Sequence, residues 1–479
     1  MSRTTINETA VDCADLGDVV HKGVAGGPSA GIAERFERLP FTAYQRRLAI
    51  ILAIFFAADV VDLVLLSFLL APISHDLGLS AQQAGIAGSA VFAGAGVGAI
   101  ASGYLSDRFG RRQILFWTML LWCSASLLTG FAWSLWSFTT FRFITGVGLG
   151  AQLPATYALV AEFMPSNRRA STTGWMHVAS QSSVVFFNLL SYGIIAQVGV
   201  AMGWRTMFVL MFLVGLFSLY LWRHLPESPR WYEAHGHMPM AEDGMLKFER
   251  AVEQALGRSL LPITAKTNDL TRHAENEKST FATLFSQGYA QRTLFAWGLW
   301  FVVLLAYYGI SVWVGKFLVD RGMSVSESIG IGVLISAAGV PAAWCAGHAM
   351  ERLGRRPVIV AVLLCVAVAA YIYSHAATLT GIMAAGAMMQ FFLVGTATAL
   401  YAYTPELFPT RARATGLGTA ATIGRIAAVT GPLMIPLLVA RWGYSGAFIV
   451  CAGCFVSAAF LVLIFGPETR NQAIERATS

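Results

Sequence analysis

The sequence predicts an all-α membrane protein with twelve transmembrane helices arranged as two pseudo-symmetric six-helix bundles. Three observations predict this fold class. Only 12% of the 479 residues are charged, against roughly 25% in an average soluble domain, so the chain could not cover a water-exposed surface. Twelve apolar stretches are long enough for a bilayer core about 30 Å thick, which takes about 20 residues. Two motifs of the first half also return in the second half.

The apolar stretches give the order of the elements. The first six cover residues 48–74, 84–105, 113–132, 137–163, 170–198 and 204–223, and the second six cover 291–318, 327–350, 357–375, 380–404, 412–440 and 444–466. The predicted domains are an N-terminal tail over 1–45, a first bundle over 46–223, a polar central loop over 224–290, a second bundle over 291–466 and a C-terminal tail over 467–479. We expect the first tail to be a mobile extension, because it is polar and lacks the apolar stretch of a cleavable signal.

Basic residues are distributed unequally between the two sides of the predicted membrane domain. One side carries ten arginines in its short loops: Arg108, Arg111, Arg112, Arg168, Arg169, Arg352, Arg355, Arg356, Arg411 and Arg413. The loops of the other side and their margins carry Arg205, Lys316, Arg321 and Arg441. An excess of Lys and Arg marks the cytoplasmic side. We therefore expect an inner (plasma) membrane protein with both termini in the cytoplasm.

An internal repeat predicts the architecture. The segment GYLSDRFGRR at 103–112 returns as GHAMERLGRR at 347–356, which is 244 residues later. At the same offset, Glu162, Pro165 and Arg169 return as Glu406, Pro409 and Arg413. Two motifs with one offset indicate that the halves are copies with the same topology. Parallel six-helix repeats of this kind form transporters whose solute site lies near the bilayer midplane between the halves.

The repeated charges predict a gate at the cytoplasmic side. Asp107 ends the second apolar stretch and can accept hydrogen bonds from arginines and from helix N-termini, which would hold the two halves together. The same role is expected of the charged residues around it and at the equivalent places in the repeat: Arg108, Arg112, Glu162, Arg169, Glu351, Arg356, Glu406 and Arg413. The alternative is that these charges only mark the border of the membrane.

Four charged residues lie well inside the apolar stretches: Asp59, Asp62, Arg142 and Arg425. Each costs about 2.5–3.5 kcal/mol at the centre of a membrane helix, so each needs a partner or water. Asp59 and Asp62 are three residues apart and share a helix face. Arg142 lies in the outer half of the fourth stretch, where it can approach Asp62.

Arg425 lies near the middle of the eleventh stretch, and no acidic residue of the second half lies at a comparable depth. A guanidinium group without a partner there predicts an anionic solute, and the planar fork of arginine suits a carboxylate. The alternatives are an ion pair with Asp59 or Asp62, or hydrogen bonds to helix carbonyls. Further contacts to a small aromatic solute are expected from ring faces and polar tips. These are Tyr307, Tyr308, Trp313, Gln181 and Asn188, for each of which packing or lipid contact is the alternative.

Several motifs resemble a known family. The segment at 103–112, RFITGVGLG at 142–150, PESPRW at 226–231 and PET at 467–469 resemble the markers of the major facilitator superfamily and its sugar-porter-related branch. Three other segments resemble the bacterial niacin (nicotinate) porters, a branch related to the synaptic-vesicle-transporter-like proteins. They are DLVLLSFLLA at 62–71, AYYGISVW at 306–313 and the long segment from Ala399 to Pro432.

The resemblance implies proton symport of nicotinate by alternating access. In proton-coupled members of the branch, a helix-1 aspartate and a helix-4 arginine form the protonation pair, and Asp62 and Arg142 match these positions. Asp59 is the alternative proton carrier. The family pattern has two helix-1 aspartates four residues apart, whereas Ala58 holds the first of these positions here and Asp59 follows it, so the resemblance assigns a role to Asp62 and not to Asp59. A static ion pair that orders the bundle is the other interpretation of Asp62 and Arg142. Arg425 would hold the nicotinate carboxylate.

Other functions stay open at this point. The solute could be another aromatic acid or a sugar, or the protein could be a receptor that binds solute without moving it. A membrane enzyme is disfavoured, because the apolar stretches show no nucleophile and base pair, phosphate loop or metal cluster. We expect no cofactor, no metal and no nucleic acid. The expected partners are a nicotinate-like anion, protons and the lipid bilayer, and the expected state is a monomer.

Overall fold

The fold is a bundle of long helices. The computed structural model describes residues 31–260, 284–285, 289–408 and 413–469. Eleven helical segments of this part are long and apolar enough to cross a membrane. The last of them, Thr415–Phe465, holds two helices, because Gly443 breaks it with φ 68°. The described part therefore has twelve spans, and the predicted fold class is confirmed.

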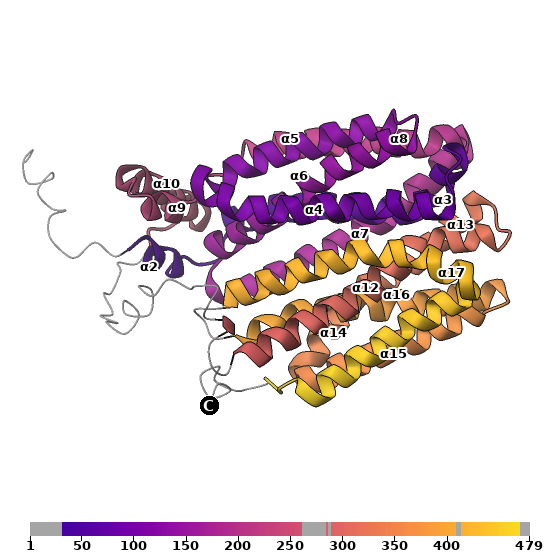
Figure 1. Cartoon of the computed structure of the whole chain (residues 1–479). Coiled ribbons are helices and arrows are strands. Elements are labelled where there is room, and N and C mark those ends of the chain that lie inside the picture. The colour runs from indigo at the N-terminus through magenta and orange to yellow at the C-terminus, as the bar shows by residue number, and fades with distance from the viewer. Residues whose placement is uncertain (1–30, 261–283, 286–288, 409–412, 470–479) are drawn as a thin grey trace, which may run out of the picture.

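The two halves have the same order of helices. The first half contains α3 (Ala43–Asp76), α4 (Ala81–Phe109), α5 (Arg111–Gly130), α6 (Leu135–Phe163), α7 (Ser166–Val198) and α8 (Val200–Trp222). The second contains α12 (Ala290–Asp320), α13 (Val325–Ala337), α14 (Gly339–Leu353), α15 (Arg355–His375), α16 (Leu379–Tyr403), the short η2 (Thr404–Leu407) and α17 (Arg413–Phe465). Figure 1 shows α4, α5, α6 and α8 in one layer and α12, α14, α15 and α17 in another.

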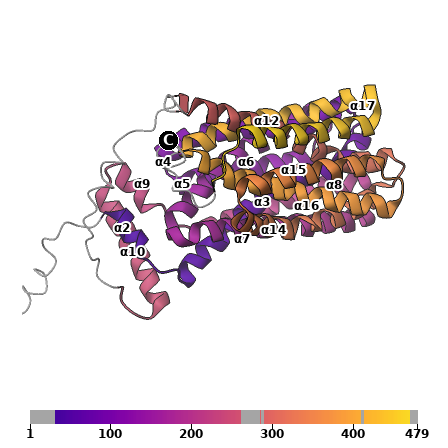
Figure 2. The same cartoon turned by 90° about the horizontal axis from the view of Figure 1, so that it is seen from below.

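Three small helices gather at one end of the two bundles, as Figures 1 and 2 both show. They are α2 (Ile32–Glu37), α9 (Pro229–Ala234) and α10 (Met238–Leu256). We call this end the α10 end and the opposite end, where α3 stops and α4 starts, the far end. The sequence predicted a polar loop over 224–290, and its amphipathic helix α10 is too short and too polar to be found by a search for membrane spans.

The prediction of a mobile tail over 1–45 is wrong for residues 31–45. Residues 1–30 lie outside the described residues. Phe36 of α2 is buried and packs edge-on against Phe248 of α10, with 5.0 Å between the ring centroids. Arg35 donates to Glu242 at 2.7 Å and to Glu249 at 2.6 Å. Helix α2 is therefore docked, by an apolar contact and by ion pairs whose acidic partners lie about 210 residues further along the chain.

Glycines allow close packing of α4 against α6. A Cβ atom on Gly94 would lie 2.0 Å from the carbonyl oxygen of Phe143, and one on Gly98 would lie 2.0 Å from that of Val147. Gly146 and Gly150, both in the motif at 142–150, meet the backbone of α4 in the same way at 2.0 and 2.1 Å. Small residues at such spacing let membrane helices approach closely. This motif therefore positions Arg142, which starts it, against the neighbouring helices.

Candidate substrate and proton site

Asp62 of α3 forms a complete ion pair with Arg142 of α6. Both side chains are fully buried, and Arg142 Nη1 donates to Asp62 Oδ2 at 2.8 Å. Arg142 Nη2 also donates to the backbone oxygen of Asp62 at 3.3 Å. Ser126 of α5 donates to the other carboxyl oxygen, Oδ1, at 3.1 Å. Both carboxyl oxygens of Asp62 thus have a donor, which is what a buried carboxylate requires.

Asp59 has no such support, although it lies one turn away on the same helix. It is fully buried, and neither of its carboxyl oxygens has a hydrogen-bond partner within the described part of the chain. The charged groups that act on it are Asp62 and Arg425. A buried ionised carboxylate without hydrogen bonds is costly, so the neutral, protonated acid is the form whose burial costs least.

Arg425 of α17 faces the first half of the molecule. Its Cβ and Cδ atoms lie 3.9 and 4.0 Å from the place that a Cβ on Gly96 of α4 would take. The side chain is partly exposed. Among the described residues it makes no hydrogen bond and no ion pair, and its closest acidic influence is the neighbouring Asp59. Of the four charged side chains inside the spans, Arg425 is therefore the one with a free cationic group.

Two tyrosines of the second half lie in the neighbourhood of Arg425. Tyr308 of α12 and Tyr401 of α16 both lie within electrostatic range of its guanidinium group. Tyr308 also contacts Phe92 of α4, with ring centroids 4.4 Å apart, and Tyr307, at 5.1 Å. The ring of Tyr308 thus spans from one half to the other beside the free cation.

Three aromatic residues on the side of the first half were not predicted as a group. Tyr157 of α6 and His177 of α7 share a hydrogen bond of 3.3 Å, and Phe56 of α3 packs on the His177 ring at 4.9 Å. Tyr157 lies within electrostatic range of Asp59 and Tyr401. The spacing of Phe56, three residues before Asp59, places it on the same helix face and could have indicated it. We know of no sequence pattern that indicates Tyr157.

The other predicted substrate contacts lie in different surroundings. Asn188 of α7 donates to Ser336 of α13 at 3.0 Å, which is a hydrogen bond between the two halves. Trp313 is 1% exposed and donates to the backbone oxygen of Pro432 at 3.1 Å. The polar groups of these two residues are therefore already bonded to protein. Gln181 of α7 faces α14, with its oxygen 3.2 Å from the place of a Cβ on Gly339.

The predicted gate charges pair within each half. Arg111 pairs with Glu162 at 3.3 Å, and the repeat-related Arg355 pairs with Glu406 at 3.0 Å. Three other arginines of this set donate hydrogen bonds: Arg108 to Tyr104 at 3.2 Å, Arg169 to Glu37 at 2.7 Å, and Arg356 to the backbone oxygen of Leu463. Arg112 lies over the ring of Trp222 at 4.1 Å, and Glu351 is exposed. The side chains of Asp107 and Arg413 lie outside the described residues. Within the described residues, these contacts therefore lie inside one half or join it to α2, and none of them forms the predicted latch between halves in this conformation.

Two glutamates of the PES and PET motifs cap helices. Glu227 accepts from the backbone N–H of Arg112 at 3.2 Å, two residues after Gly110 with φ 95°. Glu468 accepts from Arg355 N–H at 2.9 Å, directly after Gly354 with φ 100°. Each carboxylate meets unpaired N–H groups at the start of α5 or α15. Burial raises the pKa of Glu227, although the backbone N–H groups oppose this shift.

The two halves are in direct contact between the middle of the bundles and the far end. A Cβ on Gly315 of α12 would lie 2.7 Å from the backbone oxygen of Ser67 in α3. One on Gly332 of α13 would lie 2.2 Å from the ring of Phe68, and one on Gly85 of α4 would lie 3.1 Å from the backbone oxygen of Pro432. No space for a solute is left at these places.

The family model of the Major Facilitator Superfamily matches residues 49–373 and 342–479, two overlapping segments that together cover nearly the whole chain. The chain belongs to the Major Facilitator Superfamily. It is 29% identical over 454 residues to a niacin transporter, NiaP, of Acinetobacter baylyi, with 93% of this chain and 99% of that protein covered. It is 30% identical over 441 residues to a putative niacin/nicotinamide transporter of Bacillus subtilis, with 90% and 98% covered.

A solved structure of the xylose transporter XylE from Escherichia coli has the same fold. The TM-score is 0.71 at 18% identity, and the match covers 90% of this chain and 100% of that chain. Membership of this superfamily makes the protein a multi-pass secondary transporter of a small molecule and not an enzyme. Both niacin-type relatives are similar to it along most of its length.

Proposed function

We propose that the protein takes up nicotinate, or a closely similar aromatic monocarboxylate, together with a proton. The observation that carries this proposal is the free guanidinium group of Arg425, which faces the other half from the middle of α17. A partly desolvated arginine binds a carboxylate through two parallel hydrogen bonds. The rings of Tyr308 and Tyr401 beside it suit the flat ring of the same solute.

Asp59 is the proton carrier in this proposal. The sequence favoured Asp62, but Asp62 is satisfied by Arg142 and Ser126, whereas Asp59 is buried with no partner among the described residues. When Asp59 is ionised, its charge offsets that of Arg425. When Asp59 binds a proton, Arg425 is left with an uncompensated charge that attracts the carboxylate. Proton and anion thus favour each other's binding, as coupled sites must.

This arrangement makes transport electroneutral. The Asp62–Arg142 pair carries no net charge, and one proton on Asp59 matches one anion on Arg425. The loaded and the empty site then have the same charge. An anion carried alone would meet a cost of about 2.3 kcal/mol for each 100 mV of inside-negative potential. A proton carried with it removes that cost.

Alternating access follows from the two halves. We assign the α10 end to the cytoplasm on the arginine distribution, with both termini on that side and the protein in the inner membrane. The contacts near the far end, such as Phe68 against Gly332, then belong to a state closed to the outside. In the opposite state these contacts part, Asp59 takes a proton and Arg425 takes the anion. Rocking of the halves exposes both to the cytoplasm.

The names of the relatives support a niacin-like solute. A sugar is a poor match, because a cation with few amides around it does not suit neutral hydroxyl groups. Another aromatic acid, such as a hydroxybenzoate, differs from nicotinate only in the ring and is the second candidate. A receptor without transport would not need a proton site at all.

Uptake by the purified protein in proteoliposomes tests the proposal. We expect labelled nicotinate to accumulate when the outside is more acidic, to be displaced by unlabelled nicotinate, and to be little affected by nicotinamide. A potential set with potassium and valinomycin should neither drive nor block the uptake. Binding without any uptake would favour a receptor that does not transport. Stronger displacement by hydroxybenzoate than by nicotinate would favour another aromatic acid as the solute. Uptake driven by the membrane potential alone would refute proton coupling through Asp59.

A further inference from the structure

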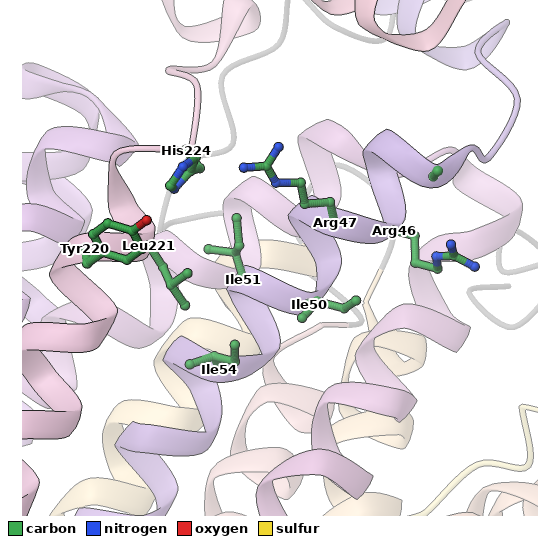
Figure 3. Close-up of a pocket in the computed structure, with 9 residues that line it drawn as sticks. Arg46, Arg47, Ile50, Ile51, Ile54, Tyr220, Leu221 and His224 are labelled. Carbon is green, nitrogen blue, oxygen red and sulfur yellow. The ribbon is translucent and has the colours of Figure 1, made fainter. Parts of the chain in front are cut away.

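A groove outside the transport site runs between the start of α3 and the end of α8. It has a volume of about 490 Å³ and is lined by Ala43, Arg46, Arg47, Ile50, Ile51, Ile54, Tyr220, Leu221 and His224. Figure 3 shows Arg47 on one helix pointing toward His224 on the other, with the isoleucines following along α3. Arg46 points away from this pair, so its guanidinium group flanks the groove.

The groove is polar at one end and apolar along its length. Two of its polar residues, Arg47 and His224, lie at the α10 end of the two helices. One turn further along each helix come Ile50 and Tyr220, and Ile54 follows deeper. Ile50 is 53% and Tyr220 56% exposed, although both lie in membrane-spanning helices. Exposed apolar side chains at that depth face lipid tails, and the polar end lies at the level of lipid headgroups.

The two arginines of the groove have no acidic partner among the described residues. Arg46 and Arg47 make no ion pair or side-chain hydrogen bond within the ranges that the structure describes, and the contact of His224 is with the Tyr220 ring at 5.6 Å. Several other arginines at this end of the bundles have an acidic partner, for example Arg35, Arg111 and Arg169. The groove therefore offers unpaired positive charge above an apolar wall.

We propose that this groove binds an anionic glycerophospholipid of the cytoplasmic leaflet. Its phosphate would lie between Arg47 and His224, where both can donate hydrogen bonds, and one acyl chain would follow Ile50 and Ile54. Basic residues beside membrane helices attract anionic lipids in this way. The bound lipid would join α3, which carries Asp59 and Asp62, to α8.

Native mass spectrometry of the full-length protein in mild detergent tests the proposal, with phosphatidylglycerol and phosphatidylcholine of equal chain length as probes. We expect one phosphatidylglycerol to stay bound at concentrations where phosphatidylcholine does not. Arg47→Gln should weaken its binding by about fivefold, because one Lys or Arg near an anionic lipid contributes on the order of that factor. His224→Leu, which removes the second hydrogen-bond donor, should weaken it as well.

Arg223→Gln is the matched control, since Arg223 is exposed, adjacent to His224 and not part of the lining. It should bind phosphatidylglycerol as the unchanged protein does. Equal weakening in Arg223→Gln and Arg47→Gln would overturn the proposal, because it would indicate only diffuse attraction. Equal binding of phosphatidylcholine would overturn it by removing the role of charge, and displacement by inorganic phosphate alone would overturn it by removing the role of the acyl chain.

Discussion

Arg142 and Asp62 form a fully buried ion pair, with 2.8 Å between Nη1 and Oδ2. One turn away on the same helix, the carboxyl group of Asp59 has no hydrogen-bond partner among the described residues. The same helix face therefore holds two aspartates in opposite electrostatic situations. Breaking a buried pair leaves a charge without compensation, whereas a protonated acid can be replaced by an amide of the same shape. The two positions are thus expected to respond differently to the same substitution.

Asp62→Asn should lower the stability of the protein, because it leaves the Arg142 charge buried without its partner. We expect a loss of about 3–5 kcal/mol, measured as reduced thermal stability in detergent. Asp59→Asn should fold normally, lose accumulation driven by a pH gradient and keep exchange of labelled for unlabelled nicotinate. A stable Asp62→Asn variant that loses pH-driven uptake, beside an Asp59→Asn variant that keeps it, would assign the proton to Asp62.

Gly110→Ala should destabilise the first half. Gly110 has φ 95°, and a Cβ there would lie 2.5 Å from Glu227, the residue that caps α5. A non-glycine residue in the left-handed region costs about 1–2 kcal/mol, and the cap is displaced in addition. The unfolding midpoint in a thermal scan measures the effect. Gly174→Ala in α7 is the control, because nothing lies within 4 Å of the new Cβ, and its unfolding midpoint should be equal or higher. A similar fall of the midpoint in both variants would show that the conformation of Gly110 is not the cause.

Docking of α2 on α10 should be lost in acid. Burial raises the pKa of Glu249, but hydrogen bonds from Arg35 and Arg38 outweigh this and hold it below its ordinary 4.5. A carboxyl group with a lowered pKa in the folded state stabilises above its unfolded pKa, and the contribution disappears as the pH falls through the lowered value. The docked arrangement should therefore persist at pH 7 and weaken only below about pH 4.5.

Spin labels on Glu34→Cys and Lys247→Cys, both exposed positions, measure this docking as a distance distribution. We expect one narrow distance at pH 7 and a broad distribution at low pH. Glu249→Gln should give the broad distribution at both. A change centred between pH 6 and 8 would show that another group controls the contact.

The hydrogen bond between Asn188 and Ser336 offers a way to hold the far end closed. Cysteines at both positions should be joined by a short, reducible cross-linker between their thiols, since the side chains at these two positions reach each other, with Asn188 Nδ2 and Ser336 Oγ 3.0 Å apart. We expect the cross-linked protein to lose nicotinate uptake and to regain it after reduction, because the halves must part there. The two single-cysteine variants are the controls. Uptake that continues through the cross-linked protein would contradict alternating access at this contact.

Much of the fold could be predicted from the sequence because the bilayer sets the length of each helix and the repeat sets the topology. The charged side chains inside the apolar stretches could also be found, since their cost in lipid makes them rare. The contact between Arg142 and Asp62 was expected from their depths and is present. Their roles in transport stay predictions.

What the sequence could not resolve depends on small rotations and on distant partners. Asp59 and Asp62 lie on one helix face, and only the orientation of α3 against α5 and α6 decides which of them meets Arg142. The docking of α2 on α10 depends on the contact between Arg35 and Glu249, which are more than 200 residues apart in the sequence. The charges at the α10 end repeat in both halves, but the repeat does not say whether they bond within a half or between halves.

Calorimetry tests whether Arg425 binds the carboxylate of nicotinate. The affinities of nicotinate and nicotinamide are measured for the unchanged protein and for Arg425→Gln. Arg441→Gln, at an exposed position near the far end, is the control. Hydrogen bonds to a charged group contribute about 1.5–3 kcal/mol. We expect Arg425→Gln to bind nicotinate at least about tenfold more weakly than the unchanged protein does and to bind nicotinamide equally well. Arg441→Gln should bind both compounds normally. Equal affinity of Arg425→Gln and the unchanged protein for nicotinate would show that Arg425 does not receive the carboxylate.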